Sequence, residues 1–380
     1  MSDPDALAAA LRRLWDGVDL SAEESRAAVD VIMDGAAPPA RIGAFLAALH
    51  AKGEVASEVV GAARAMRARA ERVRCERSPL VDTCGTGGDG GRTFSVSTAA
   101  ALVAAGAGAV VAKHGNRAAS GRFGGADVLE ALGVAIDQSA ESASRCLDEV
   151  GMAFLFAPRM HPAMRHAGPV RRELGLPTIF NLLGPLTNPA GVRRQVVGVA
   201  SPAALRLIAQ ALLELGAEHA LVVHGRDGLD EISLSAETDA LEVRGGEIRE
   251  LVLDAASFKL RPVPAAAILA RDLESSAAML REILAGAATP GAEVVIANAA
   301  AALYVAGIAA SLPEGAQRAR AAIASGAARR ILDRLVERTR RAGRGVRTTG
   351  AGGPRASRAA KARVRRPARP AAPAARAKKR

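Results

Sequence analysis

Two glycine-rich polar loops, separated by an apolar segment, fill the stretch 81–127 and constrain the fold more than any other part of the chain. In the first loop, 85–91, five of the seven residues are glycine. Glycine has no Cβ, so backbone N–H groups in such a loop can approach an anion closely. The sequence SVST at 95–98 then precedes the apolar run 99–105, which indicates a helix N-terminus with its partial positive charge. A strand, a glycine loop and a helix N-terminus are therefore expected to meet at one point, which favours phosphate binding.

The first loop does not match the common nucleotide-binding motifs. The chain reads GGDGGRT at 87–93, without the lysine that a Walker A motif requires. It also reads G-x-G-x-x-G from Gly85, but Lys113 and His114 stand where a dinucleotide site has its acidic residue. A tight turn whose glycines serve geometry alone remains an alternative for this loop considered by itself.

The second loop, KHGNR at 113–117, directly follows the short apolar run 109–112, which predicts a buried strand. Two cations, an imidazole and an amide thereby stand at the carboxyl end of a strand, where open α/β sheets bind their ligands. A lone histidine is more often structural than functional. A polar run directly after a buried strand is harder to explain in that way.

A pair of adjacent acids, Asp230 and Glu231, follows a further apolar run at 220–223 and two glycines. Carboxylate oxygens are ligands that Mg²⁺ prefers, and Mg²⁺ usually arrives with substrate phosphates. An adjacent Asp and Glu alone more often form a solvated turn. Their position after a glycine-marked strand end favours a metal site.

In combination, these motifs resemble those of the anthranilate phosphoribosyltransferases, enzymes of tryptophan biosynthesis. The likeness covers about residues 5–340 and rests on GTGGD (85–89), SVST (95–98), KHGN (113–116), ADVLEALG (126–133), HPAMRHAGPVRRELGLPTIFNLLGPLTNP (161–189) and GLDEIS (228–233). The resemblance implies transfer of the phosphoribosyl group of 5-phosphoribosyl 1-diphosphate to the amine of anthranilate. It also implies Mg²⁺ as cofactor and a homodimer.

The resemblance assigns roles to individual residues. It implies a metal site of Ser97, Asp230 and Glu231, and an anthranilate site of Gly85, His114, Asn116, Pro158, His161 and Arg171. It implies that phosphoribosyl diphosphate binds at Gly85, Gly88, Asp89, Thr93, Ser95, Val96, Ser97, Thr98, Lys113, His114, Gly115, Asn116, Arg117, Ala118, Ala119, Ser120, Gly121 and Gly125. Arg171 is expected to bind the anthranilate carboxylate bidentately. Because the anthranilate amine is a neutral nucleophile, positioning by His114, Asn116 and Arg171 is expected to supply much of the catalysis.

The chain departs from the family pattern at four positions. Ser95 stands where asparagine is common, Gly121 and Gly125 stand where serine is frequent, and Met164 replaces an aromatic residue of some relatives. Backbone contacts to the diphosphate survive such changes, whereas side-chain contacts do not. Because Met164 stands at this position, the sequence does not predict which side chains make the outer contacts to anthranilate.

We expect an α/β fold of the nucleoside phosphorylase and phosphoribosyltransferase kind. A small helical domain is predicted at 1–76, and the family uses this domain for its dimer interface. A larger α/β domain with a central, mostly parallel sheet is predicted at 77–161 and 191–340. A helical segment at about 162–190 is predicted to pack on the first domain.

Local signals support the helical assignments. Ser21 and Glu24 form a capping box, Gly35 can end the helix that follows, and Pro39 can begin the next one. The apolar run 294–312 is long enough to raise the question of a membrane span, but its richness in alanine predicts a buried helix.

The formal net charge of +12 comes from one end of the chain. Of the 51 Lys and Arg residues, 16 lie in 338–380, which has no acid, and this leaves 35 against 39 acidic residues elsewhere. The basic tail, 341–380, has too little apolar surface to order itself and is predicted to be disordered. Two interpretations remain open for it: a solubilising extension, or a polybasic arm that contacts nucleic acid without sequence preference.

The three cysteines show no metal or redox spacing, and the N-terminus MSDPDALAAA lacks a signal pattern. Both features predict a cytoplasmic protein with reduced thiols.

Two other functions stay open. A pyrimidine nucleoside phosphorylase of the same fold class would carry a lysine- and serine-containing glycine loop and an extra C-terminal lobe; the acid pair, and a body that ends near residue 340, argue against it. A non-catalytic nucleic-acid-binding relative would suit the basic tail. However, aromatic residues make up only 2% of the chain, so platforms for base stacking are scarce.

Overall fold

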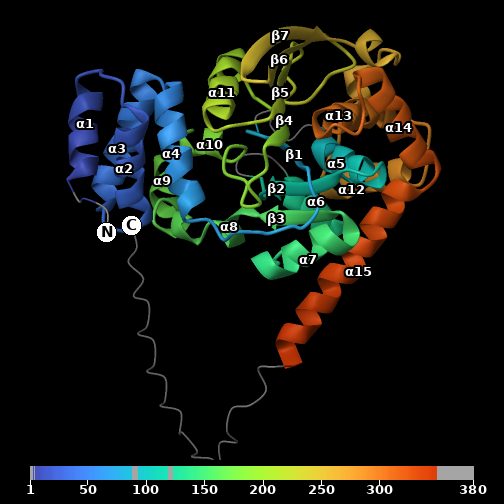
Figure 1. Ribbon diagram of the computed structural model, residues 1–380, viewed down its shortest axis with the longest axis horizontal. Coiled ribbons are helices and arrows are strands. Elements are labelled where there is room, and N and C mark those ends of the chain that lie inside the picture. The colour runs from blue at the N-terminus through green and yellow to red at the C-terminus, as the bar shows by residue number, and fades with distance from the viewer. Residues whose placement is uncertain (1–2, 4, 88–92, 119–122, 349–380) are drawn as a thin grey trace, which may run out of the picture.

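The computed structural model describes residues 3, 5–87, 93–118 and 123–348. The N-terminal part is a bundle of helices, drawn in blue in Figure 1, against which two short green helices pack. These elements are α1 (Ala6–Trp15), α2 (Ala22–Met33), α3 (Pro39–Lys52), α4 (Ala56–Ala68), α9 (Gly168–Leu174) and α10 (Phe180–Leu183). Both predicted starts are confirmed: Ser21 and Glu24 cap α2 reciprocally, and Pro39 is the first residue of α3.

Within the described residues, seven strands form one sheet in the order β3-β2-β1-β4-β5-β6-β7. The strands β1 to β5 are parallel, and β6 and β7 run antiparallel at one edge, so the prediction of a mostly parallel sheet is confirmed. Their bounds are β1 (Leu80–Gly85), β2 (Val110–Gly115), β3 (Met152–Phe156), β4 (Arg194–Gly198), β5 (His219–Gly225), β6 (Thr238–Arg244) and β7 (Glu247–Leu253).

Apolar residues on both faces of the central strands explain the parallel arrangement, because parallel sheets are covered on both sides. In β5, Leu221 and Val223 belong to one buried core, while Ala220 and Val222 belong to the other. The second core also contains the helical bundle and α11 (Pro202–Glu214). The helical domain therefore shares its core with one face of the sheet.

The first core lies between the other face of the sheet and a layer of helices. The helix α5 (Val96–Gly106), which begins where the sequence predicted, packs against the apolar α13 (Pro290–Ala306). The remaining helices are α6 (Gly125–Ala131), α7 (Ala140–Val150), α8 (Ala157–Met160), α12 (Leu273–Leu284), α14 (Leu312–Ala324), α15 (Ala327–Thr348) and the 3-10 helices η1 (Pro162–Arg165), η2 (Ala256–Phe258) and η3 (Ala265–Ile268). Among the helices searched, none combines the length and apolar character needed to cross a bilayer.

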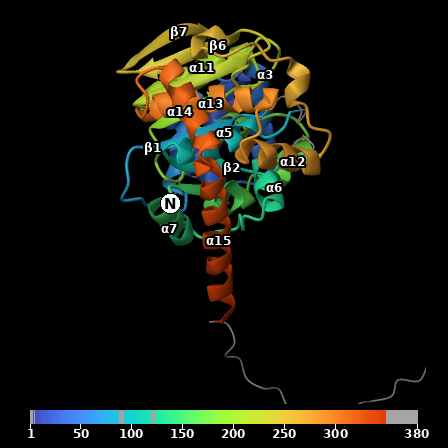
Figure 2. The same cartoon turned by 90° about the vertical axis from the view of Figure 1, so that its right-hand side faces the viewer.

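The helix α15 projects from the body, as Figure 2 shows. Ile331, Leu332 and Leu335 anchor its first half in the core. The helix continues to Thr348, so the prediction of disorder is wrong for 341–348. Extending an anchored helix costs little where good helix formers such as arginine follow, and Arg341 pairs with Glu337 one turn earlier. The rest of the basic tail, 349–380, lies outside the described residues.

Candidate active site

Many of the predicted site residues that the structure describes lie at the carboxyl ends of the parallel strands or in the segments that directly follow them. The chain runs outward from β1 to β2 and β3 on one side, and from β4 to β5 on the other. Loops after β1 and β4 therefore leave the sheet in opposite directions, and such a switch point leaves a crevice where α/β proteins bind ligands. β1 ends at Gly85 and β2 at Gly115, at the start of the two predicted loops.

Two glycines let the loop that carries the acid pair lie against the strand ends. A Cβ at position 85 would lie 3.2 Å from Asp230 Oδ2, and a Cβ at position 198 would lie 1.6 Å from the backbone oxygen of Asp230. The carboxylate of Asp230 is therefore directed at the beginning of the first glycine loop. Gly198 was missed by the sequence analysis, although a glycine that ends an apolar run was the available signal.

Two of the three predicted metal ligands, Ser97 and Glu231, meet at the N-terminus of α5. Glu231 Oε1 accepts a hydrogen bond of 2.9 Å from the backbone N–H of Ser97, in the first turn of that helix. The positive end of the helix dipole stabilises a carboxylate at this point. Through Asp230 and Gly85, the same group extends to the first loop.

Lys113 is buried beneath this group. Its Nζ donates to Ser97 Oγ at 3.2 Å and also to the backbone oxygen of Thr83. Burial lowers the pKa of Lys113, and the charges of Asp82 and Glu231 partly oppose that shift. The lysine was predicted to bind phosphoribosyl diphosphate. Its described contacts support the first turn of α5 from below.

A second buried acid, Asp82, ties the two loop-bearing strands together. It accepts hydrogen bonds from the His114 backbone N–H (3.2 Å) and from Asn188 Nδ2 (2.8 Å), and the same Asn188 nitrogen donates to the backbone oxygen of Ala112. Burial raises the pKa of Asp82 to about 6. Asp82 was not predicted as a site residue, although an acid directly after two apolar residues of a strand was a usable signal.

Two buried histidines face each other at the second loop. The ring centroids of His114 and His161 are 5.1 Å apart. His114 Nδ1 donates to the backbone oxygen of Gly184 at 2.9 Å, and His161 has a hydrogen bond with the backbone of Thr187. Burial lowers the pKa of His114 to about 3 and that of His161 to about 4, so both rings are neutral. Within the described structure, the Nε2 atoms of both rings are buried without a hydrogen-bond partner. They are therefore two acceptor atoms prepared for an N–H donor.

Arg171 carries a positive charge beside a neutral hydrogen-bond partner. It lies in α9, half-buried, with its guanidinium carbon 5.4 Å from the centroid of the Phe180 ring. Its Nη2 donates to Asn181 Oδ1 at 3.3 Å. In the part of the chain that the structure describes, Arg171 has no carboxylate within ion-pair distance. A partly desolvated guanidinium with a neutral partner is suited to bind a carboxylate from outside the protein.

Arg117, by contrast, is already paired. Its Nη1 lies 2.6 Å from Asp127 Oδ1 and 2.5 Å from Glu130 Oε2, both on α6. Asp127 also accepts from the backbone N–H of Gly124 at 2.8 Å, which caps α6. The arginine was predicted to bind phosphoribosyl diphosphate, but here its guanidinium serves this ion-pair cluster.

Two of the departures from the family pattern meet in space. Ser95 Oγ donates to Thr98 Oγ1 at 2.7 Å. A Cβ at Gly125 would lie 3.0 Å from Thr98 Oγ1 and 3.9 Å from Ser95 Oγ. The serine at 95 and the missing side chain at 125 therefore shape the same corner beside the first turn of α5.

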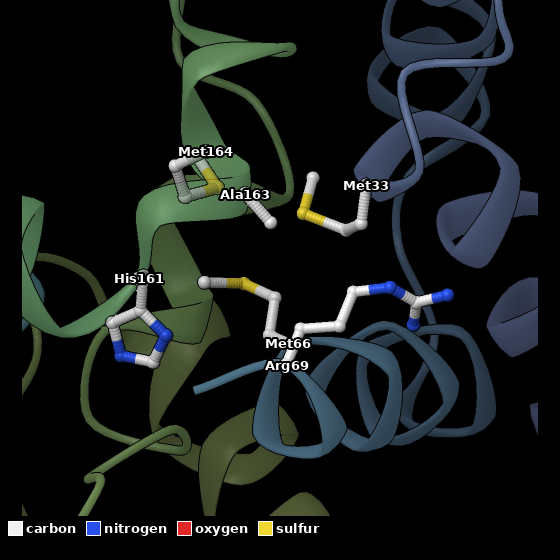
Figure 3. A pocket seen from close by; sticks show the side chains of 6 residues that line it. All are labelled: Met33, Met66, Arg69, His161, Ala163 and Met164. Atoms are coloured by element: carbon white, nitrogen blue, oxygen red, sulfur yellow. The ribbon is translucent and has the colours of Figure 1, made fainter. Parts of the chain in front are cut away.

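Met164, a third departure, lies at the junction with the helical domain. It lines a small recess with His161 of the histidine pair, Met33 of α2 and Met66 of α4, as Figure 3 shows. Flexible thioether side chains fill irregular gaps well. The outer wall of the histidine site is thus built by both domains.

The remaining predicted residues flank these groups. Asn116 Oδ1 accepts a hydrogen bond of 2.8 Å from the backbone N–H of Arg117. Gly115 lies against Phe154, since a Cβ there would be 2.8 Å from the ring. Pro158 lies in α8, directly after β3.

Val96 is buried in the first turn of α5, Thr93 forms an isolated bridge with Leu269, and the Ala118 N–H lies 3.5 Å from Asp127 Oδ2. Five further predicted residues lie outside the described ranges: Gly88, Asp89, Ala119, Ser120 and Gly121.

Comparisons with known proteins agree with this geometry. A family model described as "Glycosyl transferase family, a/b domain" matches residues 77–329, and one described as "Glycosyl transferase family, helical bundle domain" matches residues 8–70. The anthranilate phosphoribosyltransferase of Rubrobacter xylanophilus is 52% identical over 339 residues, which are 89% of this chain and 99% of the relative. That of Roseiflexus castenholzii is 52% identical over 84% of this chain and 94% of the relative.

Solved structures give the same result. The crystal structure of anthranilate phosphoribosyltransferase from Thermus thermophilus is 45% identical, with a TM-score of 0.82 over 87% of this chain and 99% of that chain. The enzyme from Saccharomyces cerevisiae, in complex with PRPP and Mg, is 26% identical, with a TM-score of 0.80 over 88% of this chain and 98% of that chain. Both domains match the family models, the relatives share about half of their residues with this chain, and the fold is the same. The chain therefore belongs to the anthranilate phosphoribosyltransferase family.

Proposed function

We propose that the protein transfers the phosphoribosyl group of 5-phosphoribosyl 1-diphosphate to the amine of anthranilate, releasing diphosphate, in the tryptophan biosynthesis of the cytoplasm. The observation that carries this proposal is the presence, among the described residues, of three groups with complementary chemistry. They are the acid pair at the N-terminus of α5, the neutral histidine pair, and the unbalanced guanidinium of Arg171.

The donor set fits Mg²⁺. Asp230 and Glu231 offer carboxylate oxygens and Ser97 offers a hydroxyl, all of the hard type that this ion prefers. Among the described residues, no three His, Cys, Asp or Glu side chains surround a common point. Such a site leaves coordination positions for water and substrate phosphate, as is usual for Mg²⁺. When bound, Mg²⁺ would stabilise the negative charge that develops on the departing diphosphate.

The protein's own contribution to phosphate binding would come from backbone dipoles. The N-terminus of α5 follows the first glycine loop, and the positive end of the helix dipole attracts an anion. Lys113, held beneath the first turn, adds a buried positive charge. These groups are fixed before the substrate arrives, so they stabilise charge without reorganising during the reaction.

Anthranilate would bind with its carboxylate at Arg171 and its amine at the histidine pair. A carboxylate is repelled by the lone pairs of His114 and His161, whereas an amine N–H can donate to them. The amine nitrogen then forms a bond to C1 of the ribose as the C1–O bond breaks. The electron pair of that bond leaves with diphosphate, and the nitrogen loses one proton to diphosphate or water. Because both rings have strongly lowered pKa values, we assign them a positioning role and not that of a strong base.

We also propose that the protein is a homodimer formed through the helical domain. Trp15, at the end of α1, has 84% of its surface exposed, and the neighbouring Val18 has 41% exposed. A large exposed aromatic residue beside further apolar surface is typical of an interface. Light scattering of the wild type and of Trp15→Glu tests this; a monomeric wild type would contradict it.

The decisive test is loss of anthranilate fluorescence on adding the protein, Mg²⁺ and 5-phosphoribosyl 1-diphosphate, with each component left out in turn. We expect loss only in the complete mixture. The alternative, a pyrimidine nucleoside phosphorylase, predicts instead that pyrimidine nucleosides are cleaved when orthophosphate is supplied. Cleavage of that kind without anthranilate consumption would overturn the proposed function.

A further inference from the structure

The short turn 178–181 holds the Arg171 guanidinium in place. Asn181 Oδ1 accepts two hydrogen bonds, one from Arg171 Nη2 (3.3 Å) and one from the backbone N–H of Thr178 (3.0 Å). The buried ring of Phe180 lies under the guanidinium. One oxygen and one aromatic face thus fix the direction of this arginine, and both come from the same four residues.

The partner of Arg171 is neutral. Arg67, another partly buried arginine, likewise bonds the neutral backbone oxygen of Leu186, whereas Arg69 lies against Asp30 and Asp34 and Arg194 lies against Glu218. Aspartate has the same shape as asparagine, and its oxygen would accept the same two hydrogen bonds at position 181. Steric fit therefore does not explain why residue 181 is asparagine and not aspartate. The difference in charge explains it, because a carboxylate would neutralise the guanidinium and compete with the carboxylate of a ligand.

The same turn holds a second unsatisfied group. Thr178 Oγ1 is buried and, within the described residues, has no hydrogen-bond partner. Buried polar atoms in folded proteins are nearly always satisfied, so each exception calls for an explanation. An unsatisfied hydroxyl and an unbalanced guanidinium, joined through Asn181, indicate a site that a polar ligand completes.

We propose that Asn181 is a positioning residue for substrate recognition: its amide oxygen orients the Arg171 guanidinium towards the anthranilate carboxylate without neutralising its charge. This inference rests on the proposed function. It gives a specific task to a segment that the sequence would treat as a plain connection. It also predicts that the charge at position 181, and not only its hydrogen bonds, controls the affinity for the acceptor.

The test compares Asn181→Ala with Asn181→Asp in steady-state assays in which each substrate is varied. We expect Asn181→Ala to raise the KM for anthranilate roughly tenfold, the equivalent of one charge-assisted hydrogen bond. Asn181→Asp should raise it further, roughly a hundredfold, approaching the effect of Arg171→Ala. The KM for 5-phosphoribosyl 1-diphosphate should change less than about threefold in each variant.

The order of the two variants separates this role from a structural one. A purely structural Asn181 predicts the reverse order, since aspartate keeps the hydrogen bond from Thr178 and alanine loses it. Arg172→Ala, on the exposed side of α9, is the matched control and should leave both constants unchanged. Thermal unfolding shows whether each variant is folded. If the aspartate variant does not fold, the alanine variant decides, because equal changes in both KM values would overturn the inference.

Failure of the inference and failure of the proposed function can be told apart. A wild-type protein that does not consume anthranilate refutes the function. An active wild type with an Asn181→Asp variant close to it in anthranilate KM leaves the function intact and refutes the role of Asn181 alone.

Discussion

At the scale of single residues, the acid pair is distinguished from a solvated turn by what surrounds it. Glu231 bonds the first turn of α5, and Asp230 lies against the glycine that ends β1. Adjacent acids on an exposed turn would need neither contact. The sequence could name the pair, because it follows a glycine-marked strand, but only the fold brings Ser97 to it from 134 residues away.

Replacing Asp230 and Glu231 together by Asn and Gln should abolish turnover, because the amides keep the shape but lose the charge that Mg²⁺ requires. Ser97→Ala should have a smaller effect, since water can replace one neutral ligand. Circular dichroism and a Mg²⁺ titration of the activity check both statements. Normal activity of the double variant at an ordinary Mg²⁺ concentration would show that Asp230 and Glu231 do not hold the metal.

The histidine pair makes the stability of the protein sensitive to acid. Both rings have folded-state pKa values below the usual 6.5, so the unfolded chain binds protons first as the pH falls. Stability is complete above pH 6.5 and is lost between there and about pH 4, by about 1.4 kcal/mol per pH unit for each ring. Asp82 has a raised pKa of about 6 and opposes this loss over part of the window, between pH 6 and its usual value of 3.8.

Urea unfolding of the wild type and of His161→Gln at pH 7 and pH 5 measures the effect. The variant should lose less stability between the two pH values than the wild type does. Equal losses would show that His161 is not held neutral by the fold.

At the scale of elements, sequence patterns predicted those features that depend on residues close together in the chain. The capping box of α2, the start of α5 and the buried central strands all follow from spacing and composition within a few residues. The antiparallel pair β6 and β7 was not predicted, because strand direction depends on which neighbour a strand meets. The end of α15 was placed too early for a related reason. The composition of the tail shows how little apolar surface it has, but it does not show that the tail continues a helix anchored in the core.

The contact between β4 and the acid loop gives a sharp test of element packing. A Cβ at position 198 would overlap the backbone oxygen of Asp230, so Gly198→Ala must push the acid loop away. Overpacking of this kind costs about 1–3 kcal/mol, and activity should fall with it. The control is Gly43→Ala in the middle of α3, where the new methyl group meets Val170 at an ordinary 3.6 Å.

Chemical denaturation and the transferase assay check both variants. The alanine at 43 should stabilise the protein slightly, by up to about 1 kcal/mol, because glycine disfavours a helix interior. A fully active, stable Gly198→Ala variant would contradict the close approach of the loop.

At the scale of the whole molecule, the excess of basic residues lies in a different part of the sequence from the candidate site residues. Residues 1–337 include 35 basic and 39 acidic residues, and the other 16 basic residues stand at the C-terminal end of the sequence, in 338–380. The exposed part of α15 leads away from the body of the protein (Figure 2). We therefore expect the tail to take no part in catalysis.

Truncation after Thr348 should leave the kinetic constants unchanged. The full-length protein should bind duplex DNA more tightly than the truncated one, and that difference should shrink steeply with salt, with a slope of about −0.9 per neutralised phosphate. Anisotropy titrations at several salt concentrations measure it. A folded, truncated protein without activity would show that the tail reaches the site, and equal DNA binding by both forms would leave the solubilising interpretation.

The segment 178–188 has a consequence for how acceptors are selected. It touches Arg171 through Asn181, on the side of the helical bundle, and His114 through the Gly184 carbonyl, on the side of the sheet. The distance between the Arg171 guanidinium and the His114 ring therefore depends on this segment as well as on the two domains that it touches. A substitution within 178–188 that leaves both cores intact should change which lengths of acceptor are preferred, while the metal ligands and the glycine loops stay as they are.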